Sequence, residues 1–142
     1  MKFNMISIDG IDKSGKGLVF KYLQHLGNHK HVLLDRGPLS NYMFSKMFDR
    51  KFEYDIASFS NVLIVFLDVD YSDWRIRCKI ADEPSISFDT HCEFYNDAIC
   101  RFRDNGCTVL RYNTTQMTPY NIALDVISFF ERNSDERQER HN

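Results

Sequence analysis

The sequence lacks any long uninterrupted apolar run. None of its runs approaches the roughly 20 residues that a membrane-spanning helix needs, and its first residues do not follow the pattern of a secretion signal. Positive charge is not in excess either, because the formal net charge is −2 at pH 7. This balance argues against a protein whose main role is to bind a nucleic-acid backbone. We therefore expect a soluble, cytoplasmic protein with no membrane partner.

The four cysteines have no recognisable spacing pattern. The cysteines form no CxxC pair, and no Cys/His group has the spacing of a zinc site; they are Cys78, Cys92, Cys100 and Cys107. Such isolated cysteines are typical of reduced thiols in the cytosol. We expect them to have neither a disulfide nor a metal-binding role.

Short apolar runs alternate along the chain with segments of helical periodicity. The runs are rich in Val, Ile, Leu and Phe and show no strict polar alternation, which favours strands buried on both faces; they are residues 3–9, 31–35, 61–69 and 107–113. Apolar residues at helical spacing fall between them: Leu18, Tyr22 and Leu26; Met43 and Met47, followed at the same spacing by Lys51; and Phe94, Ala98 and Phe102. A length of 142 residues fits one domain with a proper core.

Two further helices are predicted from their first residues. One begins at Ser72 and runs to about Ile80, and the last begins where Thr118 can cap the helix and Pro119 suits its first position. Strands that alternate with helices predict an α/β domain with a parallel sheet of about four strands, flanked by helices. This domain should span residues 1–132, followed by a polar tail over 133–142.

The segment GIDKSGKG, from Gly10 to Gly17, matches the GxxxxGK pattern of a phosphate loop. It follows an apolar strand and opens a helix, which is where such a loop is found in P-loop NTPase-type domains. Its backbone amides and the helix dipole would hold a polyphosphate, and Gly10 and Gly15 would let the backbone approach closely. We expect ATP phosphates to be bound by Gly10, Lys13, Ser14, Gly15, Lys16, Gly17 and Leu18.

The loop lacks the serine or threonine that usually binds Mg²⁺ directly, because position 17 is glycine. The metal must then be held through water, by a carboxylate or by Ser14. Carboxylates lie at the ends of the predicted strands, whose carboxyl ends meet at one edge of a parallel sheet; they are Asp9, Asp35, Asp68 and Asp70. We predict that Asp35 and Asp9 hold Mg²⁺ through water.

Basic residues accompany these carboxylates. Arg36 directly follows Asp35, and a carboxylate beside a guanidinium suits phosphoryl transfer, which depends mainly on positioning and charge neutralisation. In the helix from Ser72, Arg75 and Lys79 share one face and Arg77 projects separately. Together with the polar loop 81–87, this helix could close over the phosphates as a lid.

Several of these segments resemble thymidylate kinases. The phosphate loop ISIDGIDKSGKG, the strand and turn VLLDRGPLSNY, and the strand and helix LIVFLDVDYSDWRIR are each similar to that family, and FYNDAICRF corresponds to its helix after the lid. The resemblance implies that Asp12 meets the acceptor sugar, that Asp35 and Arg36 serve metal and acceptor phosphate, and that Arg77 embraces the donor phosphates. It also places Tyr42 on the acceptor side. Lys16 and Gly17 are similar to the corresponding pair in adenylate kinases.

The sequence departs from thymidylate kinases on the acceptor side. Those enzymes are about half as long again, and they place a strand and an acceptor-binding segment before the Asp-Arg strand. Only GNHKH, residues 27–31, fills that interval here, and a linker this short cannot contain a strand and its crossover. The donor site is therefore complete in the sequence, whereas the acceptor pocket is trimmed.

Three functions agree with these features. The first is an ATP- and Mg²⁺-dependent kinase that phosphorylates a (deoxy)nucleoside monophosphate, with Lys16, Asp35, Arg36 and Arg77 as catalytic residues. The second is a kinase whose acceptor is a polynucleotide end or a modified base in DNA, so that nucleic acid enters only as a substrate. The third is a nucleotide-binding protein without catalysis. The sequence leaves open whether the chain forms a homodimer.

Overall fold

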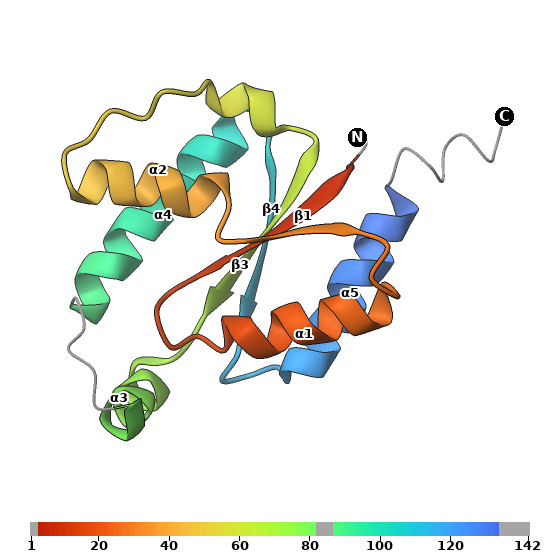
Figure 1. Ribbon diagram of the computed structural model, residues 1–142. Helices are drawn as coiled ribbons and strands as arrows, with labels where there is room; N and C mark the ends of the chain where they lie inside the picture. Colours follow the sequence, from red (N-terminus) through yellow and green to blue (C-terminus); the bar gives the residue numbers. More distant parts are fainter. Residues whose placement is uncertain (1–2, 82–86, 134–142) are drawn as a thin grey trace, which may run out of the picture.

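The protein has a single four-stranded parallel sheet. A computed structural model describes residues 3–81 and 87–133. The strands are β1 (Met5–Gly10), β2 (Val32–Asp35), β3 (Val62–Asp68) and β4 (Thr108–Asn113), all parallel and arranged in the order β2-β1-β3-β4. The predicted α/β class, with a parallel sheet of four strands flanked by helices, is confirmed (Figure 1).

Helices cover both faces of this sheet. Figure 1 shows α1 (Lys16–Leu26) and α5 (Pro119–Arg132) on one face, and α2 (Pro38–Met47) and α4 (Phe88–Asp104) on the other. Side chains of the central strand β3 alternate between the two layers, because successive residues of a strand point to opposite faces. Leu63, Val65 and Leu67 pack in the core with α1 and α5. Val62, Ile64 and Phe66 pack in the core with α2 and α4.

The outer strands are less buried than the sequence predicts. β3 is buried from its first residue to its sixth, whereas Val32 of β2 is 54% exposed. The prediction of burial on both faces is therefore wrong for β2, which lies at the edge of the sheet and pairs only with β1. Periodicity reports how apolar a segment is, but the position of a strand within the sheet determines how far neighbours cover it.

Three details of the helices go beyond or differ from what the sequence predicts. α1 buries Val19 and Leu23, while Leu18 and Tyr22 are exposed. α2 ends at Met47, before Lys51, and the backbone turns into the left-handed region at Asp49. The remaining helix, α3 (Tyr71–Ala81), begins one residue before the predicted cap at Ser72.

The predicted start of α5 agrees with the structure. The hydroxyl of Thr118 accepts a hydrogen bond from the backbone N–H of Asn121, at 3.2 Å, and Pro119 is the first helical residue. A short 3₁₀ helix, Ile56–Phe59, precedes β3. The predicted tail and most of the predicted lid loop lie outside the described residues. None of the described helices combines the length and apolarity that a bilayer crossing requires.

The order of the strands determines where a ligand can bind. The chain leaves β1 toward β2 on one side, and leaves β2 to reach β3 on the other side of β1. In open parallel sheets, the crevice outside the carboxyl ends of strands at such a reversal is the usual binding site. The turns that follow β1, β2, β3 and β4 all lie along this edge.

Candidate functional site

The turn after β1 has the backbone of an anion-binding loop. A Cβ at Gly10 would lie 2.5 Å from Oγ of Ser14 and 3.1 Å from the carbonyl oxygen of Leu67, so a larger residue would clash. Gly15 adopts a left-handed conformation with φ of 88°. It is the N-cap of α1, and no side chain caps it. The amides of the first turn of α1 therefore face the loop without a side-chain partner, which favours a bound anion.

Lys16 and Asp35 meet beside this loop. The ammonium group of Lys16 forms an ion pair with Oδ1 of Asp35, at the end of β2, and the two side chains are 18% and 61% exposed. The carboxylate predicted as a metal ligand and the lysine predicted for the phosphates are thus direct neighbours. Because the carboxylate of this pair is largely exposed, solvent screens the attraction, and the pair can open at low cost when a phosphate arrives.

Arg77 reaches the phosphate loop from α3. Its Nη1 donates to the carbonyl oxygen of Lys13, at 2.8 Å, and to Oγ1 of Thr114, at 3.3 Å. It also lies 3.9 Å from where a Cβ on Gly15 would be. Arg77 follows the buried Trp74 by three residues, so both lie near the same, inward side of α3.

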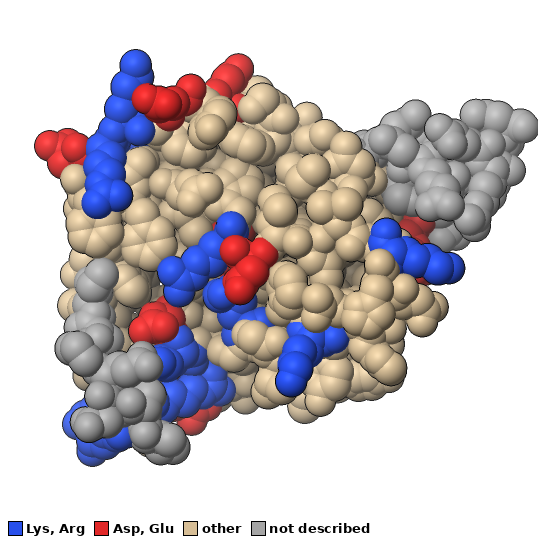
Figure 2. All heavy atoms as spheres, viewed as in Figure 1, with Lys and Arg blue, Asp and Glu red and all other residues tan. Residues whose placement is uncertain are grey.

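The other lid residues point elsewhere. The guanidinium of Arg75 lies over the ring of Tyr71, 6.0 Å from its centroid, and Lys79 is exposed. In Figure 2, Lys and Arg atoms gather over α3 and in the region between α1 and α2, with carboxylates among them. This face of the molecule therefore offers positive charge around the phosphate loop, although the net charge of the chain is negative.

Arg36 is held in a strained conformation at the end of β2. Its φ is 63°, which is uncommon for any residue other than glycine. Its backbone N–H donates to the carbonyl oxygen of Ile8, at 2.9 Å, and its guanidinium lies 5.9 Å from the centroid of the Phe44 ring. The backbone of the Asp-Arg turn is thus fixed to β1, and the exposed side chain is directed over α2.

Asp9 is fully buried. Its Oδ1 accepts hydrogen bonds from the backbone N–H groups of Gly37 and Ser40, at 2.9 and 3.1 Å, and its Oδ2 accepts one from the hydroxyl of Ser7, at 3.1 Å. Burial raises the pKa of Asp9, and these hydrogen bonds oppose the rise. Because the protein's own donors occupy this carboxylate, Asp9 ties the start of α2 to β1. We therefore assign the proposed metal contact to Asp35 without Asp9.

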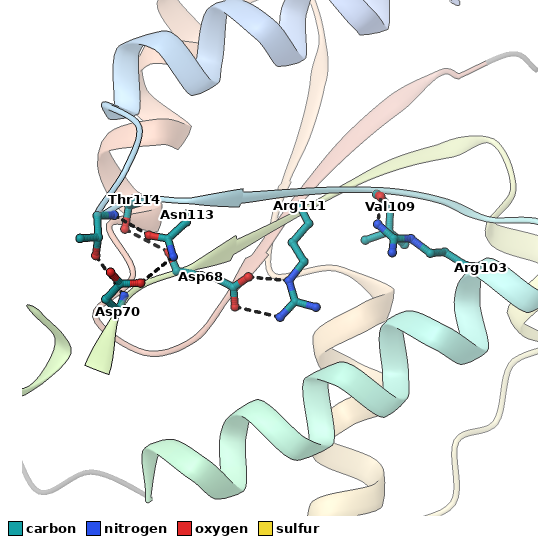
Figure 3. Close-up of polar contacts among 8 residues, drawn as sticks. Asp68, Asp70, Arg103, Val109, Arg111, Asn113 and Thr114 are labelled. Carbon is teal, nitrogen blue, oxygen red and sulfur yellow. Dashed lines mark hydrogen bonds and ion pairs between the residues drawn. The ribbon is translucent and has the colours of Figure 1, made fainter. Parts of the chain in front are cut away.

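The carboxylates at the end of β3, Asp68 and Asp70, are paired with side chains of β4, as Figure 3 shows. Oδ1 of Asp68 accepts from Nη2 of Arg111 at 3.1 Å, and Oδ1 of Asp70 accepts from Nδ2 of Asn113 at 2.9 Å. Among the described residues, no group of three or more His, Cys, Asp or Glu side chains could hold a metal ion. Asp35 is the strand-end carboxylate that faces the lysine of the loop.

The predicted acceptor residues occupy different surroundings. Asp12 is partly buried, and its charge acts on two side chains of α4, His91 and Tyr95. Tyr42 is only 5% exposed and packs in the core against Phe52 and Phe102, at ring-centroid distances of 5.3 and 5.6 Å. These contacts give Tyr42 a packing role, and the proposals below do not include it.

Some buried polar atoms without a hydrogen-bond partner belong to segments that follow the carboxyl ends of the strands. Within the described part of the chain they are Oγ of Ser14, Nε1 of Trp74 and both ring nitrogens of His91. Ser14 lies in the loop, Trp74 in the helix after β3, and His91 in the first turn of α4, whose start adjoins the carboxyl ends of the strands. Buried polar groups without partners are rare in folded proteins and often mark a site for water or a ligand. Sequence reasoning missed His91, because a single histidine within a helical period has no distinguishing motif.

Comparison with solved structures finds proteins of similar fold. No protein-family model matches the sequence, and no curated protein is significantly similar to it. Its structure is similar to the crystal structure of the YorR protein from Bacillus subtilis in complex with phosphorylated GDP, with a TM-score of 0.71. The chain shares the fold of YorR. The match covers 97% of this chain and 98% of YorR at 20% sequence identity, so the likeness extends over the whole domain.

Proposed function

We propose that this protein is an ATP-dependent nucleotide kinase that transfers a phosphoryl group to a (deoxy)nucleoside monophosphate. The observation that carries the proposal is the convergence of Lys16 and Arg77 on the phosphate loop, where no side chain caps the first helix. The shared fold supports it, because YorR was crystallised with a phosphorylated nucleotide. The resemblance of the loop and the Asp-Arg turn to thymidylate kinases supports the class of acceptor.

In this proposal the donor phosphates lie in the loop. Lys16 exchanges Asp35 for the β and γ phosphates, since a phosphate offers it more negative charge than one carboxylate does. Arg77 already lies against the backbone of Lys13, and a small shift of its guanidinium would bring it to the charge that develops during transfer. The remaining catalytic role, binding of the acceptor phosphate, belongs to Arg36.

The residues present fit a magnesium ion that is mostly hydrated. Mg²⁺ in phosphoryl-transfer sites is usually held by one or two carboxylates, substrate phosphates and water. Asp35 is accessible and adjoins the loop, and Gly17 has open space around it, with no atom within 4 Å of where a Cβ would lie. Bound there, Mg²⁺ would neutralise charge on the transferred group. Asp35 would hold its water shell once Lys16 has moved to the phosphates.

The proposal is tested by measuring phosphate transfer directly. The purified protein is incubated with ATP, Mg²⁺ and each common nucleoside monophosphate, with short oligonucleotides and with no acceptor, and release of ADP is followed. We expect release that depends on a nucleoside monophosphate. Transfer only to oligonucleotides would instead favour a polynucleotide kinase, and ATP binding without transfer to any acceptor would favour a non-catalytic nucleotide-binding protein.

Replacement of Arg36 by alanine should weaken binding of the acceptor without weakening binding of ATP. We expect the KM for the acceptor to rise about tenfold to hundredfold, since hydrogen bonds to charged groups contribute about 1.5–3 kcal/mol. The Kd of ATP, measured by titration calorimetry, should change less than twofold. The matched control is Arg50→Ala, because Arg50 also lies over a phenylalanine ring but on the loop after α2. A loss of ATP binding in the Arg36 variant would contradict its assignment to the acceptor.

A further inference from the structure

His91 is buried where the proposed acceptor would bind. The residue is 6% exposed, and neither of its ring nitrogens has a hydrogen-bond partner within the described residues. A neutral imidazole has one N–H donor and one acceptor nitrogen, so both of its hydrogen-bonding groups are unused. A phenylalanine or leucine would fill the same space without this cost, which indicates that the imidazole serves something other than packing.

The surroundings of His91 are those predicted for the acceptor. Its ring meets Phe44 edge to face, with centroids 6.4 Å apart, and the guanidinium of Arg36 lies over the same phenylalanine ring, at 5.9 Å. The charges of Asp12 and Arg36 both act on the imidazole, in opposite directions. His91, at the start of α4, therefore lies within electrostatic range of two segments distant in the sequence, the loop after β1 and the turn after β2.

Hydrogen bonds one turn further along α4 keep this helix in position. The hydroxyl groups of Tyr95 and Ser40 are 3.0 Å apart, and the backbone N–H of Ser40 binds the buried carboxylate of Asp9. Burial raises the pKa of Tyr95 to about 12, so its hydroxyl stays protonated. The imidazole of His91 is thus carried by a helix that is tied, through α2, to β1.

The charge state of His91 indicates what kind of group it can recognise. Burial lowers the pKa of His91, the carboxylate of Asp12 opposes this to a smaller extent, and the guanidinium of Arg36 adds a still smaller lowering. A neutral imidazole discriminates by hydrogen bonds rather than by charge. Phosphate would go to Arg36, and the neutral donors and acceptors of the nucleoside would remain for His91.

We propose that His91 binds the nucleoside part of the acceptor nucleotide through one donated and one accepted hydrogen bond. This inference rests on the proposed function, because it takes Arg36 as the residue that holds the acceptor phosphate. The Arg36 guanidinium and the His91 imidazole both lie beside the Phe44 ring, so an acceptor whose phosphate binds Arg36 would bring its nucleoside part near His91. His91 then provides recognition on the acceptor side, where the chain lacks the segment that thymidylate kinases place before their Asp-Arg strand.

The test compares His91→Leu and His91→Gln with the unchanged protein. Titration calorimetry measures the Kd of each common ribo- and deoxyribonucleoside monophosphate in the presence of a non-hydrolysable ATP analogue, and the Kd of the analogue alone. We expect the leucine variant to bind the preferred monophosphate at least tenfold more weakly and the analogue as before. Glutamine keeps one donor and one acceptor and should restore part of the affinity. Preferences between ribose and deoxyribose, or between bases, that disappear in the leucine variant identify the group recognised.

Folding and binding effects are separated by two further measurements. The Tm of His91→Leu should equal or exceed that of the unchanged protein, because a buried polar group without partners has been removed. His31→Leu is the matched control, since His31 packs against Phe130 in the other helix layer and should leave every Kd unchanged.

Two results would overturn the inference. One is a His91→Leu variant that binds monophosphates as tightly as the unchanged protein. The other is an unchanged protein that binds no monophosphate while still binding the ATP analogue, which would leave the donor half of the proposed function standing. Failure to bind the analogue itself would instead refute the proposed function, and with it the inference.

Discussion

Replacement of Lys16 by alanine is expected to abolish stabilisation by ATP and to reduce phosphate transfer by on the order of 10²–10³-fold, as the loss of one preorganised charge contact does in comparable sites. ATP at 100 times its Kd should raise the stability of the unchanged protein by about 2.7 kcal/mol. Lys16 makes the main charge contact proposed for the phosphates. The shift in Tm on adding ATP should therefore disappear in the variant. Differential scanning fluorimetry and the ADP-release assay measure the two effects.

In the absence of nucleotide, this substitution should change the stability of the protein very little. Lys16 is paired with a carboxylate that is 61% exposed, and such ion pairs contribute about 0–1 kcal/mol. Lys21→Ala is the matched control, because Lys21 lies on the same helix and is exposed. An unchanged ATP-induced shift in Lys16→Ala would refute the role of Lys16 at the phosphates. A large loss of Tm without ATP would show that its pairing with Asp35 is structural.

Replacement of Asp9 by alanine should destabilise the fold by about 2–4 kcal/mol. The variant leaves the buried N–H groups of Gly37 and Ser40 without an acceptor, and each such group costs about 1–3 kcal/mol. At this chain length the loss corresponds to a fall in Tm of roughly 6–12 °C. Urea unfolding monitored by circular dichroism gives the free energy of unfolding.

The matched substitution is Asp9→Asn. The asparagine oxygen can accept from Gly37 and Ser40 and its amide can donate to Ser7, so the loss should stay within about 1 kcal/mol. The variant also tests the raised pKa of Asp9. An acid whose folded pKa is raised favours the folded state at low pH, and this contribution is lost as pH rises from about 4 through the folded pKa. The asparagine variant should therefore gain stability relative to the unchanged protein between pH 4 and 7. A relative loss over this range would show that the hydrogen bonds outweigh burial.

The fold could be predicted closely because its signals are local. A strand buried on both faces must be apolar at nearly every position, and β3 satisfies this from Val62 to Leu67. The start of α5 could be predicted for the same reason, since Thr118 and Pro119 act within one turn. The edge position of β2 and the inward face of α1 could not, because both depend on which other elements lie beside them.

In the candidate site, too, some features could be predicted from local sequence and others depended on tertiary contacts. A loop of GxxxxGK type can be recognised from the spacing of its residues, and the structure gives Gly15 the left-handed backbone that such a loop needs. The carboxylates after the strands look equivalent in the sequence, yet the structure buries Asp9, pairs Asp68 with Arg111 and leaves Asp35 facing Lys16. Nothing in the composition around His91 distinguishes it from a histidine of the core.

The sequence by itself therefore determined the class of the fold, the position of the GxxxxGK turn between β1 and α1, and the set of charged residues at the ends of the strands. The tertiary structure alone decided which of those residues are available, because burial and pairing depend on contacts between segments far apart in the chain. It brought Arg77 onto the loop, committed Asp9 to the backbone of α2, and placed the unpartnered imidazole of His91 beside Phe44, which also carries the Arg36 guanidinium. Spacing along the chain encodes local geometry, whereas the availability of a charged group is a property of the assembled core.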